Sequence, residues 1–278
     1  MASNPSIGDV FQNLRARGQM AFMPFVTAGD PDLEFTSQLI VELARQGVDL
    51  VEVGFPYSDP IADGPVIQAS YTRALARKLH VEQIFEQIAR VPWNTIPGGH
   101  RPPLLAMVAY AIVFRMGTAV FCEKAARAGF SGLILPDLPA DEAAETATIA
   151  RAHGLDLVQL IAPTTTAART QRIIETASGF LYCISVAGTT GVREALPEEL
   201  SAQLRGLKSR TQLPLAVGFG ISRPEQVAPL RGLADGVIVG SALVREVAKR
   251  TEEGASAEVV LKSVGEAAAA MLQACRAK

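Results

Sequence analysis

The sequence predicts an α/β fold in which eight strand–helix units close into a (β/α)8 barrel. Three observations support this prediction: short apolar or β-branched runs alternate with segments of helical period, each strand precedes its helix, and eight such units fill the 278 residues. Apolar strands joined by helices form a parallel sheet that the helices cover, and this length suits a single barrel domain over residues 1–278. An open doubly wound sheet is the alternative, because periodicity does not reveal closure.

The eight predicted strands are short runs rich in apolar and β-branched residues. They begin near Met20, Val48, Leu104, Ser131, Leu155, Phe180, Leu213 and Ala234. Ahead of the first strand, IGDVFQNLRARG has helical spacing, and we expect this extra N-terminal helix to close the bottom of the barrel. Between the first two strands, DLEFTSQLIVELARQG repeats apolar residues every three or four positions and ends at Gly47, a helix stop signal.

The second unit is longer than the others. Between its strand and the third strand the chain holds two helical patterns, PVIQASYTRALARK and VEQIFEQIARV, followed by the loop-rich segment PWNTIPGGHRPP. We therefore expect extra structure after strand 2. At the end of the chain, EAAAAMLQACRA predicts a final helix, because alanine has the highest helix propensity.

Charge and cysteine content narrow the class of protein. The formal net charge is −2, so the chain has no excess of basic residues to neutralise nucleic-acid phosphates or an acidic membrane. The three cysteines are far apart, which is typical of reduced thiols in a cytosolic protein. The first residues lack the pattern of a signal peptide, and no apolar run is long enough to span a bilayer. We expect a soluble cytoplasmic protein.

Glu52 is an acidic residue within the apolar strand VDLVEVGF. Alternation along the strand puts Leu50, Glu52 and Gly54 on one face, so Glu52 points either into the barrel or under the helices. Both places are dry, and burial of a lone carboxylate raises its pKa. A carboxyl poised near neutrality both donates and accepts protons. The alternative is a structural glutamate held by a salt bridge or hydrogen bonds.

Asp63 lies in the loop SDPIADGP that follows this strand. Asp-Pro and Asp-Gly-Pro sequences are ordinary turn formers, so a purely structural role is one interpretation of Asp63. The other follows from position: catalytic sites of (β/α)8 barrels lie at the carboxyl ends of the strands. A strand-borne acid followed by acids on a proline-stiffened loop favours two carboxylates over one pocket.

Glycine-rich turns follow the last three predicted strands, in the segments SVAGTTGVRE, VGFGIS and VGSALV. Glycines let backbone N–H groups approach an anion, and the following helix adds its positive amino end. The loops after strands seven and eight commonly bind phosphate in this fold. We expect a phosphate ester held mainly by backbone amides, because no lysine stands beside these glycines. Ser241 is either a helix cap or a direct phosphate donor.

Neither a metal nor an organic cofactor is expected. The three histidines, His80, His100 and His153, fall in predicted helix ends or loops rather than at zinc-ligand spacing. No Walker loop or nucleophile-elbow sequence is present.

Six segments together resemble the α subunits of tryptophan synthase. They run in that family's order from Phe22 to Val244: FMPFVTAGDPD, VEVGFPYSDPIADGPVIQAS, LILPDLP, AGTTGVRE, VGFGISRPEQV and ADGVIVGSALV. The resemblance implies a (β/α)8 lyase that cleaves indole-3-glycerol phosphate to indole and glyceraldehyde 3-phosphate, without metal or organic cofactor. It also implies a partner β subunit, which uses pyridoxal phosphate to convert indole to tryptophan, in an α2β2 tetramer.

The resemblance also assigns roles to residues. Glu52 is similar to the family's general acid/base and Asp63 to its second catalytic acid. Thr190 is similar to the threonine that meets the second acid when the lid closes. The remaining positions resemble residues that contact the substrate: the aromatic residues Phe25, Tyr110 and Tyr182, and the phosphate cradle Gly191, Gly220, Gly240 and Ser241, with Phe219 beside it.

One position departs from the family pattern. After the third strand the family reads tyrosine, any residue and asparagine, whereas this chain has Tyr110, Ala111 and Ile112. In the family that asparagine lies near the β-subunit interface. Two alternatives therefore stand beside the synthase subunit: a free-standing lyase that releases indole, and a non-catalytic phosphate-binding regulatory subunit. A sugar-phosphate isomerase on the same barrel is a further one.

Overall fold

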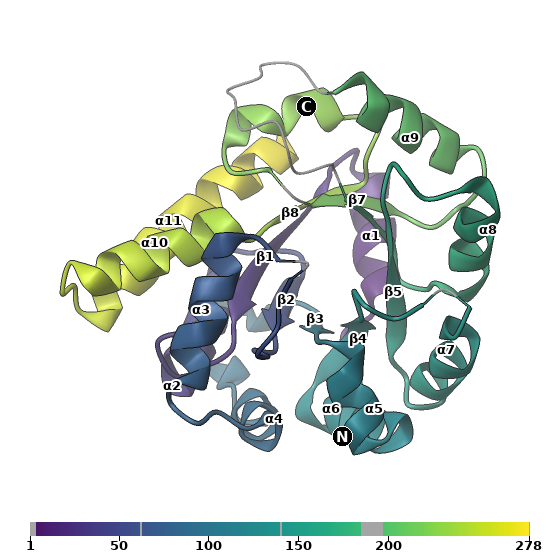
Figure 1. The fold of residues 1–278 in the computed structure, drawn as a ribbon. Coiled ribbons are helices and arrows are strands. Elements are labelled where there is room, and N and C mark those ends of the chain that lie inside the picture. The colour runs from purple at the N-terminus through teal and green to yellow at the C-terminus, as the bar shows by residue number, and fades with distance from the viewer. Residues whose placement is uncertain (1–3, 62, 140, 185–196, 219, 278) are drawn as a thin grey trace.

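Eight parallel strands close into a barrel in chain order in the computed structural model, which describes residues 4–61, 63–139, 141–184, 197–218 and 220–277 (Figure 1). The strands are β1 Ala21–Thr27, β2 Val51–Gly54, β3 Leu104–Met107, β4 Phe130–Ile134, β5 Asp156–Ile161, β6 Leu181–Ile184, β7 Leu215–Gly218 and β8 Gly236–Val239. Pairing of β1 with β8 closes the ring, for example Phe22 with Val237. The predicted TIM barrel is confirmed, and the open-sheet alternative is wrong.

Helices surround the barrel in the described part of the chain (Figure 1). They are α1 Ile7–Ala16, α2 Leu33–Arg45, α3 Pro65–Leu75, α4 Val81–Ala89, α5 Tyr110–Met116, α6 Thr118–Ala128, α7 Ala143–Ala152, α8 Ala167–Thr176, α9 Glu198–Lys208, α10 Ser241–Glu252 and α11 Ala257–Arg276. Helices α3 and α4 are the extra structure expected after strand 2. Helix α5 was not expected.

Between β7 and β8 the strand-then-helix pattern is broken. The structure has two 3-10 turns there, η3 Pro224–Gln226 and η4 Ala228–Leu230, instead of an α-helix. Pro229 explains why no longer α-helix forms: in a helix that began at Pro224 it would lie in the second turn, where its missing N–H could not bond the Glu225 carbonyl and its ring would clash with that carbonyl.

Helix α1 closes the amino-terminal end of the barrel, as predicted. Ser6 caps it by accepting a hydrogen bond from the Asp9 N–H. Its buried residues Ile7, Phe11 and Leu14 recur at three- and four-residue spacing and join the cluster inside the barrel. The Phe11 ring lies 5.6 Å from the ring of Phe180, just ahead of β6.

Alternation along the strands divides the core in two. On β1, Met23 and Phe25 face a cluster inside the barrel, whereas Phe22 and Val26 face the shell between strands and helices. Both clusters are buried, which explains why the strands are almost continuously apolar. The same alternation therefore decides which strand residues reach a site inside the barrel.

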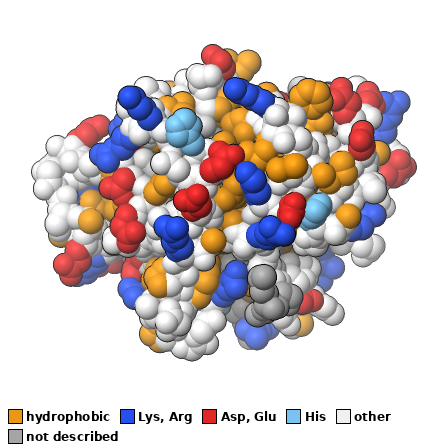
Figure 2. Space-filling model, turned by 90° about the horizontal axis from the view of Figure 1, so that it is seen from below, with side chains coloured by type: hydrophobic (Ala, Val, Ile, Leu, Met, Phe, Trp, Pro, Cys, Tyr) orange, Lys and Arg blue, Asp and Glu red, His pale blue; other side chains and the backbone are white. Residues whose placement is uncertain are grey.

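Charged side chains of both signs are interspersed on the face seen in Figure 2, with apolar side chains between them. This mixture agrees with the small net charge of the sequence. Within the described ranges, no helix is both long and apolar enough to cross a bilayer.

Candidate active site

Glu52 lies at the middle of β2 and points into the barrel. Its strand neighbours Val51 and Val53 belong to the outer shell, so the alternate residue faces inward. Glu52 pairs with Phe25 of β1 and Leu105 of β3, both members of the inner cluster. Of the two placements that the sequence allowed, the interior is therefore correct.

The Glu52 carboxyl is dry and without a protein partner. The residue is 1% exposed, and neither of its oxygens has a hydrogen-bond partner in the described part of the chain. Burial, with a smaller contribution from the charge of Asp63, raises the pKa of Glu52 from 4.5 to about 8. Among the described residues, Glu52 forms neither the salt bridge nor the hydrogen bonds that a structural role would require. The group is poised to donate and accept protons near neutral pH.

Asp63 belongs to a turn and also presents a carboxylate to this region. Its N–H donates to the Pro60 carbonyl at 3.0 Å. The side-chain amide of Gln68 on α3 donates to the carbonyls of Pro60 (3.1 Å) and Asp63 (2.8 Å), which ties the loop to the helix. The half-buried carboxylate accepts a hydrogen bond from the Tyr57 hydroxyl at 3.4 Å. Burial raises the pKa of Asp63, and the Tyr57 hydrogen bond opposes that rise.

Two tyrosines beside the acids were not singled out from the sequence. The rings of Tyr57 and Tyr71 lie 5.6 Å apart, and Tyr71 is only 1% exposed. Burial raises the pKa of both phenols, and the charge of Asp63 raises them further. Tyr57 lies within the quoted loop sequence, and Tyr71 follows Ile67 by one helical turn on the buried face of α3. The helical spacing of Tyr71 from Ile67 was the sequence signal that could have identified Tyr71 as a buried residue near the site.

Phe25 and Tyr182 lie in the barrel interior opposite glycines that make room for them. Each ring occupies the space that a side chain would take, at Gly54 for Phe25 and at Gly218 for Tyr182. A carbon added at Gly54 would also come within 2.8 Å of the Tyr71 hydroxyl. Burial raises the pKa of Tyr182, and the charges of Glu52 and Asp63 add to this rise. Phe25 therefore lies beside Glu52 across the strand pair, and Tyr182 lies within the electrostatic reach of both acids.

Tyr110 is the first residue of α5, beyond the end of β3. Its backbone N–H donates to the Asp137 carboxylate at 2.6 Å, and its ring lies 6.1 Å from that of Phe114. The side chain packs against the outer shell instead of the inner cluster. Contact between Tyr110 and a substrate stays a prediction.

Gly240 and Ser241 form the amino end of α10. The helix cap is Gly240, and no side chain makes a capping hydrogen bond there. The interpretation of Ser241 as the cap is therefore wrong, because it is the first helical residue and its side chain is exposed. The first N–H groups of an α-helix have no partner within the helix, and they carry partial positive charge. A carbon added at Gly240 would touch Phe25 at 3.4 Å, so this helix end borders the same interior.

Gly220 follows β7 in a left-handed conformation, with φ of +84°. Its carbonyl accepts a hydrogen bond from the Gln226 side chain at 3.1 Å. Three other predicted site residues, Thr190, Gly191 and Phe219, lie outside the described residues.

The described residues include no group of three or more His, Cys, Asp or Glu side chains placed to hold a metal ion. All three cysteines are free and buried.

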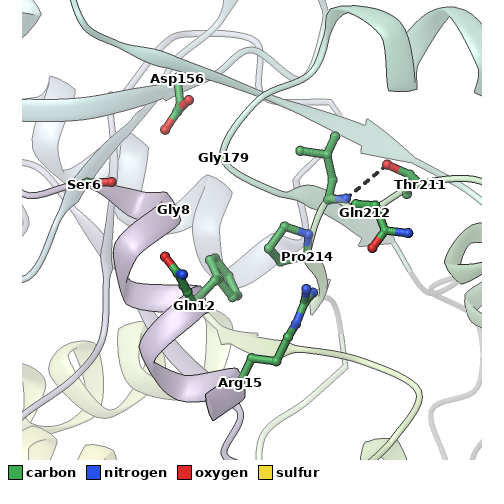
Figure 3. Close-up of a pocket in the computed structure, with 11 residues that line it drawn as sticks. Ser6, Gly8, Gln12, Arg15, Asp156, Gly179, Thr211, Gln212 and Pro214 are labelled. Carbon is green, nitrogen blue, oxygen red and sulfur yellow. Dashed lines mark hydrogen bonds between the residues drawn. The ribbon is translucent and has the colours of Figure 1, made fainter.

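A separate pocket lies at the opposite end of the barrel, between α1 and the approaches to β5 and β7 (Figure 3). It is lined by Ser6, Gly8, Phe11, Gln12, Arg15, Asp156, Gly179, Thr211, Gln212, Leu213 and Pro214. Asp156 begins β5 and Pro214 precedes β7, so this pocket opens at the amino ends of the strands. It is remote from Glu52 and belongs to the face where (β/α)8 barrels carry stability instead of catalysis.

A family model and the curated relatives of this chain point to the same family. The family model described as tryptophan synthase alpha chain matches residues 11–274. A tryptophan synthase alpha chain from Rhodopirellula baltica is 47% identical over 247 residues, covering 89% of this chain and 88% of the relative. One from Carboxydothermus hydrogenoformans is 43% identical over 258 residues, covering 93% and 95%.

Solved structures agree with this. The crystal structure of tryptophan synthase subunit alpha from Legionella pneumophila superposes with a TM-score of 0.87 at 36% identity, covering 99% of both chains. A mutant alpha subunit from Pyrococcus furiosus gives 0.79 at 32% identity, covering 92% of this chain and 99% of that one. Matches of this extent and identity show that the chain belongs to the tryptophan synthase alpha chain family.

Proposed function

We propose that Glu52 and Asp63 carry out the cleavage of indole-3-glycerol phosphate in this chain. That cleavage, a step of tryptophan biosynthesis, is the activity of the family to which the chain belongs. The assignment to these two residues rests on one observation: a carboxyl 1% exposed inside the barrel, with both oxygens unpartnered among the described residues and within the electric field of a second acid.

Glu52 serves as the general acid and base. Breaking the bond between the indole ring and the glycerol side chain requires a proton on the ring carbon that departs. It then requires removal of the proton from the side-chain hydroxyl as the aldehyde forms. A carboxyl with a pKa of about 8 starts protonated at neutral pH, gives up its proton in the first step and recovers one in the second. The glutamate therefore ends the reaction in its starting form.

Asp63 serves as the anionic partner of the indole nitrogen. Protonation of the ring carbon leaves positive charge on that nitrogen, and a carboxylate opposite it stabilises the charge. The hydrogen bond from the Tyr57 hydroxyl lowers the pKa of Asp63 against the effect of burial, which favours the ionised form that this role needs. Thr190, outside the described residues, is the proposed partner of Asp63 when the loops close over the substrate.

Backbone amides at the ends of β7 and β8 bind the phosphate. The helix α10 begins at Ser241, next to the barrel interior, and its first N–H groups are available to an anion. Gly220 lies at the end of the neighbouring strand. Gly191 and Phe219 complete the proposed cradle, together with Gly240 and the Ser241 hydroxyl.

The proposed partner is a tryptophan synthase β subunit, in an α2β2 complex within the cytoplasm. The three free, buried cysteines support a reducing compartment. One feature favours the free-standing lyase instead: Ile112, at the family's asparagine position, is half-buried and packs against the outer shell. A rate of indole release that is low alone and rises strongly with the β subunit supports the partner, and full activity alone supports the free-standing lyase.

The direct test is incubation of the purified protein with indole-3-glycerol phosphate while indole is measured. Glu52→Gln should retain the fold and phosphate binding but lose turnover, because general acid–base catalysis is worth roughly a hundred- to ten-thousandfold. Asp63→Asn should also lower the rate strongly. Retention of most activity by Glu52→Gln would rule out Glu52 as the general acid and base. If the wild-type protein releases no indole even with its partner, the result would point to the non-catalytic regulatory subunit.

A further inference from the structure

The side chain of Gln226 makes four hydrogen bonds to the loop after β7. Its Oε1 atom accepts from the backbone N–H groups of Ser222 (2.8 Å) and Arg223 (3.0 Å) and from the Ser222 hydroxyl (3.3 Å). Its Nε2 atom donates to the Gly220 carbonyl at 3.1 Å. One amide therefore bridges the two ends of the loop.

The contact with the Gly220 carbonyl falls at a backbone position where the residue type permits several conformations. Gly220 has φ of +84°, a conformation that glycine adopts easily but does not hold by itself. A peptide group is planar and trans, so its carbonyl and its N–H point in opposite directions. Fixing the Gly220 carbonyl against Gln226 turns the Ile221 N–H of the same peptide group away from Gln226. A side chain outside the loop therefore contacts both peptide groups that flank Ile221 and Ser222.

We propose that Gln226 is a positioning residue for phosphate binding: its amide holds the Gly220 backbone in the orientation that accepts the phosphate group. This inference rests on the proposed function, in which the end of β7 forms part of the phosphate site. Backbone donors bind an anion well when they are already oriented, because no ordering cost is paid on binding. An amide suits this position because the contacts require one acceptor and one donor on the same group.

Two variants separate the parts of this interaction. Gln226→Glu retains an acceptor for Ser222 and Arg223 but has no donor for the Gly220 carbonyl, and it adds a negative charge. Gln226→Met has similar length without charge or hydrogen bonds. Both should raise the KM for indole-3-glycerol phosphate and the Kd for glycerol 3-phosphate about tenfold, because each loses a backbone contact of typical strength. The kcat at saturating substrate should stay within about twofold, since Gln226 does not touch the reacting atoms.

Ser222→Ala is the matched control, because it removes one bond to Gln226 and leaves the Gly220 contact intact. Its KM and Kd should equal those of the wild-type protein. Wild-type Kd values in both Gln226 variants would overturn the inference, as would a loss confined to Gln226→Glu, which would indicate simple charge repulsion. A fall in kcat with unchanged KM would also overturn it. Absence of indole release by the wild-type protein would count instead against the proposed function, because glycerol 3-phosphate titration by calorimetry does not require turnover.

Discussion

Glu52 is a carboxyl that the fold keeps buried without a neutralising partner among the described residues. Its position on β2 directs it inward, and its neighbours Phe25 and Leu105 are apolar. Burial of an ionised carboxylate without compensation is costly, so the group is protonated over most of the neutral range. The protein thus retains a residue that is useful for proton transfer but unfavourable for stability when it ionises.

This cost predicts how stability depends on pH. The pKa of Glu52 is about 8 in the folded protein and 4.5 ordinarily, so between these values the folded state holds a proton that the unfolded state has released. The free energy of unfolding therefore falls as pH rises through this interval, by at most about 1.4 kcal/mol per pH unit, and levels off above it. Glu52→Gln has no such titration. The stability of the variant relative to the wild-type protein should rise steadily from pH 5 to pH 8.

Urea unfolding of both proteins across this pH range measures the difference. Any constant offset from burying the glutamine amide cancels, because the prediction concerns the slope. Glu82→Gln is the control: Glu82 is exposed, and its pKa is lowered by its own backbone N–H and by Lys124, so its removal should not produce the same gain. Parallel pH profiles for the wild-type protein and Glu52→Gln would contradict the prediction.

At the scale of elements, helix α3 carries one side of the site and is fastened to β1 and its loop. The guanidinium of Arg73 donates to both oxygens of the buried Asp30 carboxylate, at 2.9 and 2.6 Å. The hydroxyls of Thr27 and Ser70 lie 2.7 Å apart. These contacts hold the helix that presents Tyr71 and whose Gln68 binds the Asp63 loop. Side-chain contacts between β1 and α3, which are separated in the chain by α2 and β2, therefore support the proposed catalytic end of the barrel.

Helix α1 lies at the other end of the barrel from the proposed site, and it stabilises the amino-terminal end of the strands. Phe11 is 4% exposed and its ring packs near that of Phe180. Phe11→Ala should lower the free energy of unfolding by about 3–5 kcal/mol, the usual cost of deleting a buried aromatic ring. The kcat should stay close to that of the wild-type protein at temperatures where the variant is folded, because the proposed site lies at the other end of the barrel.

Urea unfolding tests the predicted loss of stability of Phe11→Ala. Indole release at a low temperature, where the variant is folded, tests the predicted kcat. Gln12→Ala changes the neighbouring exposed position of the same helix and should alter stability by less than about 0.5 kcal/mol. Equal stability of Phe11→Ala and Gln12→Ala would show that α1 is not a structural closure. Loss of kcat in folded Phe11→Ala would show that the two ends of the barrel are coupled.

At the scale of the whole molecule, periodicity predicted all eight strands because each is a short apolar run buried on both faces. Closure was predicted from the number of strand–helix units, because periodicity alone does not reveal the pairing between β1 and β8 at distant positions in the chain. Glu52 was identified because a charge inside such a run is conspicuous. Tyr71 was missed because its ring lies on a helix and reaches the acids only through tertiary packing against Gly54. The role proposed for Gln226 likewise depends on a loop conformation that sequence pattern does not reveal.

Apolar exposure at the carboxyl end of the barrel is consistent with the proposed β-subunit partner. Phe114 on α5 is 71% exposed although it is a large aromatic residue, and α5 follows β3 directly. Burial of such a side chain at the centre of an interface commonly contributes more than 1 kcal/mol to binding. Phe114→Ser should therefore raise the β-subunit concentration needed for half-maximal stimulation of indole release by about tenfold. Its activity without the partner should match that of the wild-type protein.

Val259 provides the comparison, because it is also apolar and exposed, at 51%, but lies at the start of α11. If α5 faces the β subunit, Val259→Ser should need the same β-subunit concentration as the wild-type protein, and only Phe114→Ser should need more. Equal concentrations for all three proteins would place the docking surface elsewhere on the barrel. Stimulation of none of them by any concentration of β subunit would favour the free-standing lyase, and Ile112 would then mark a chain that works without a partner.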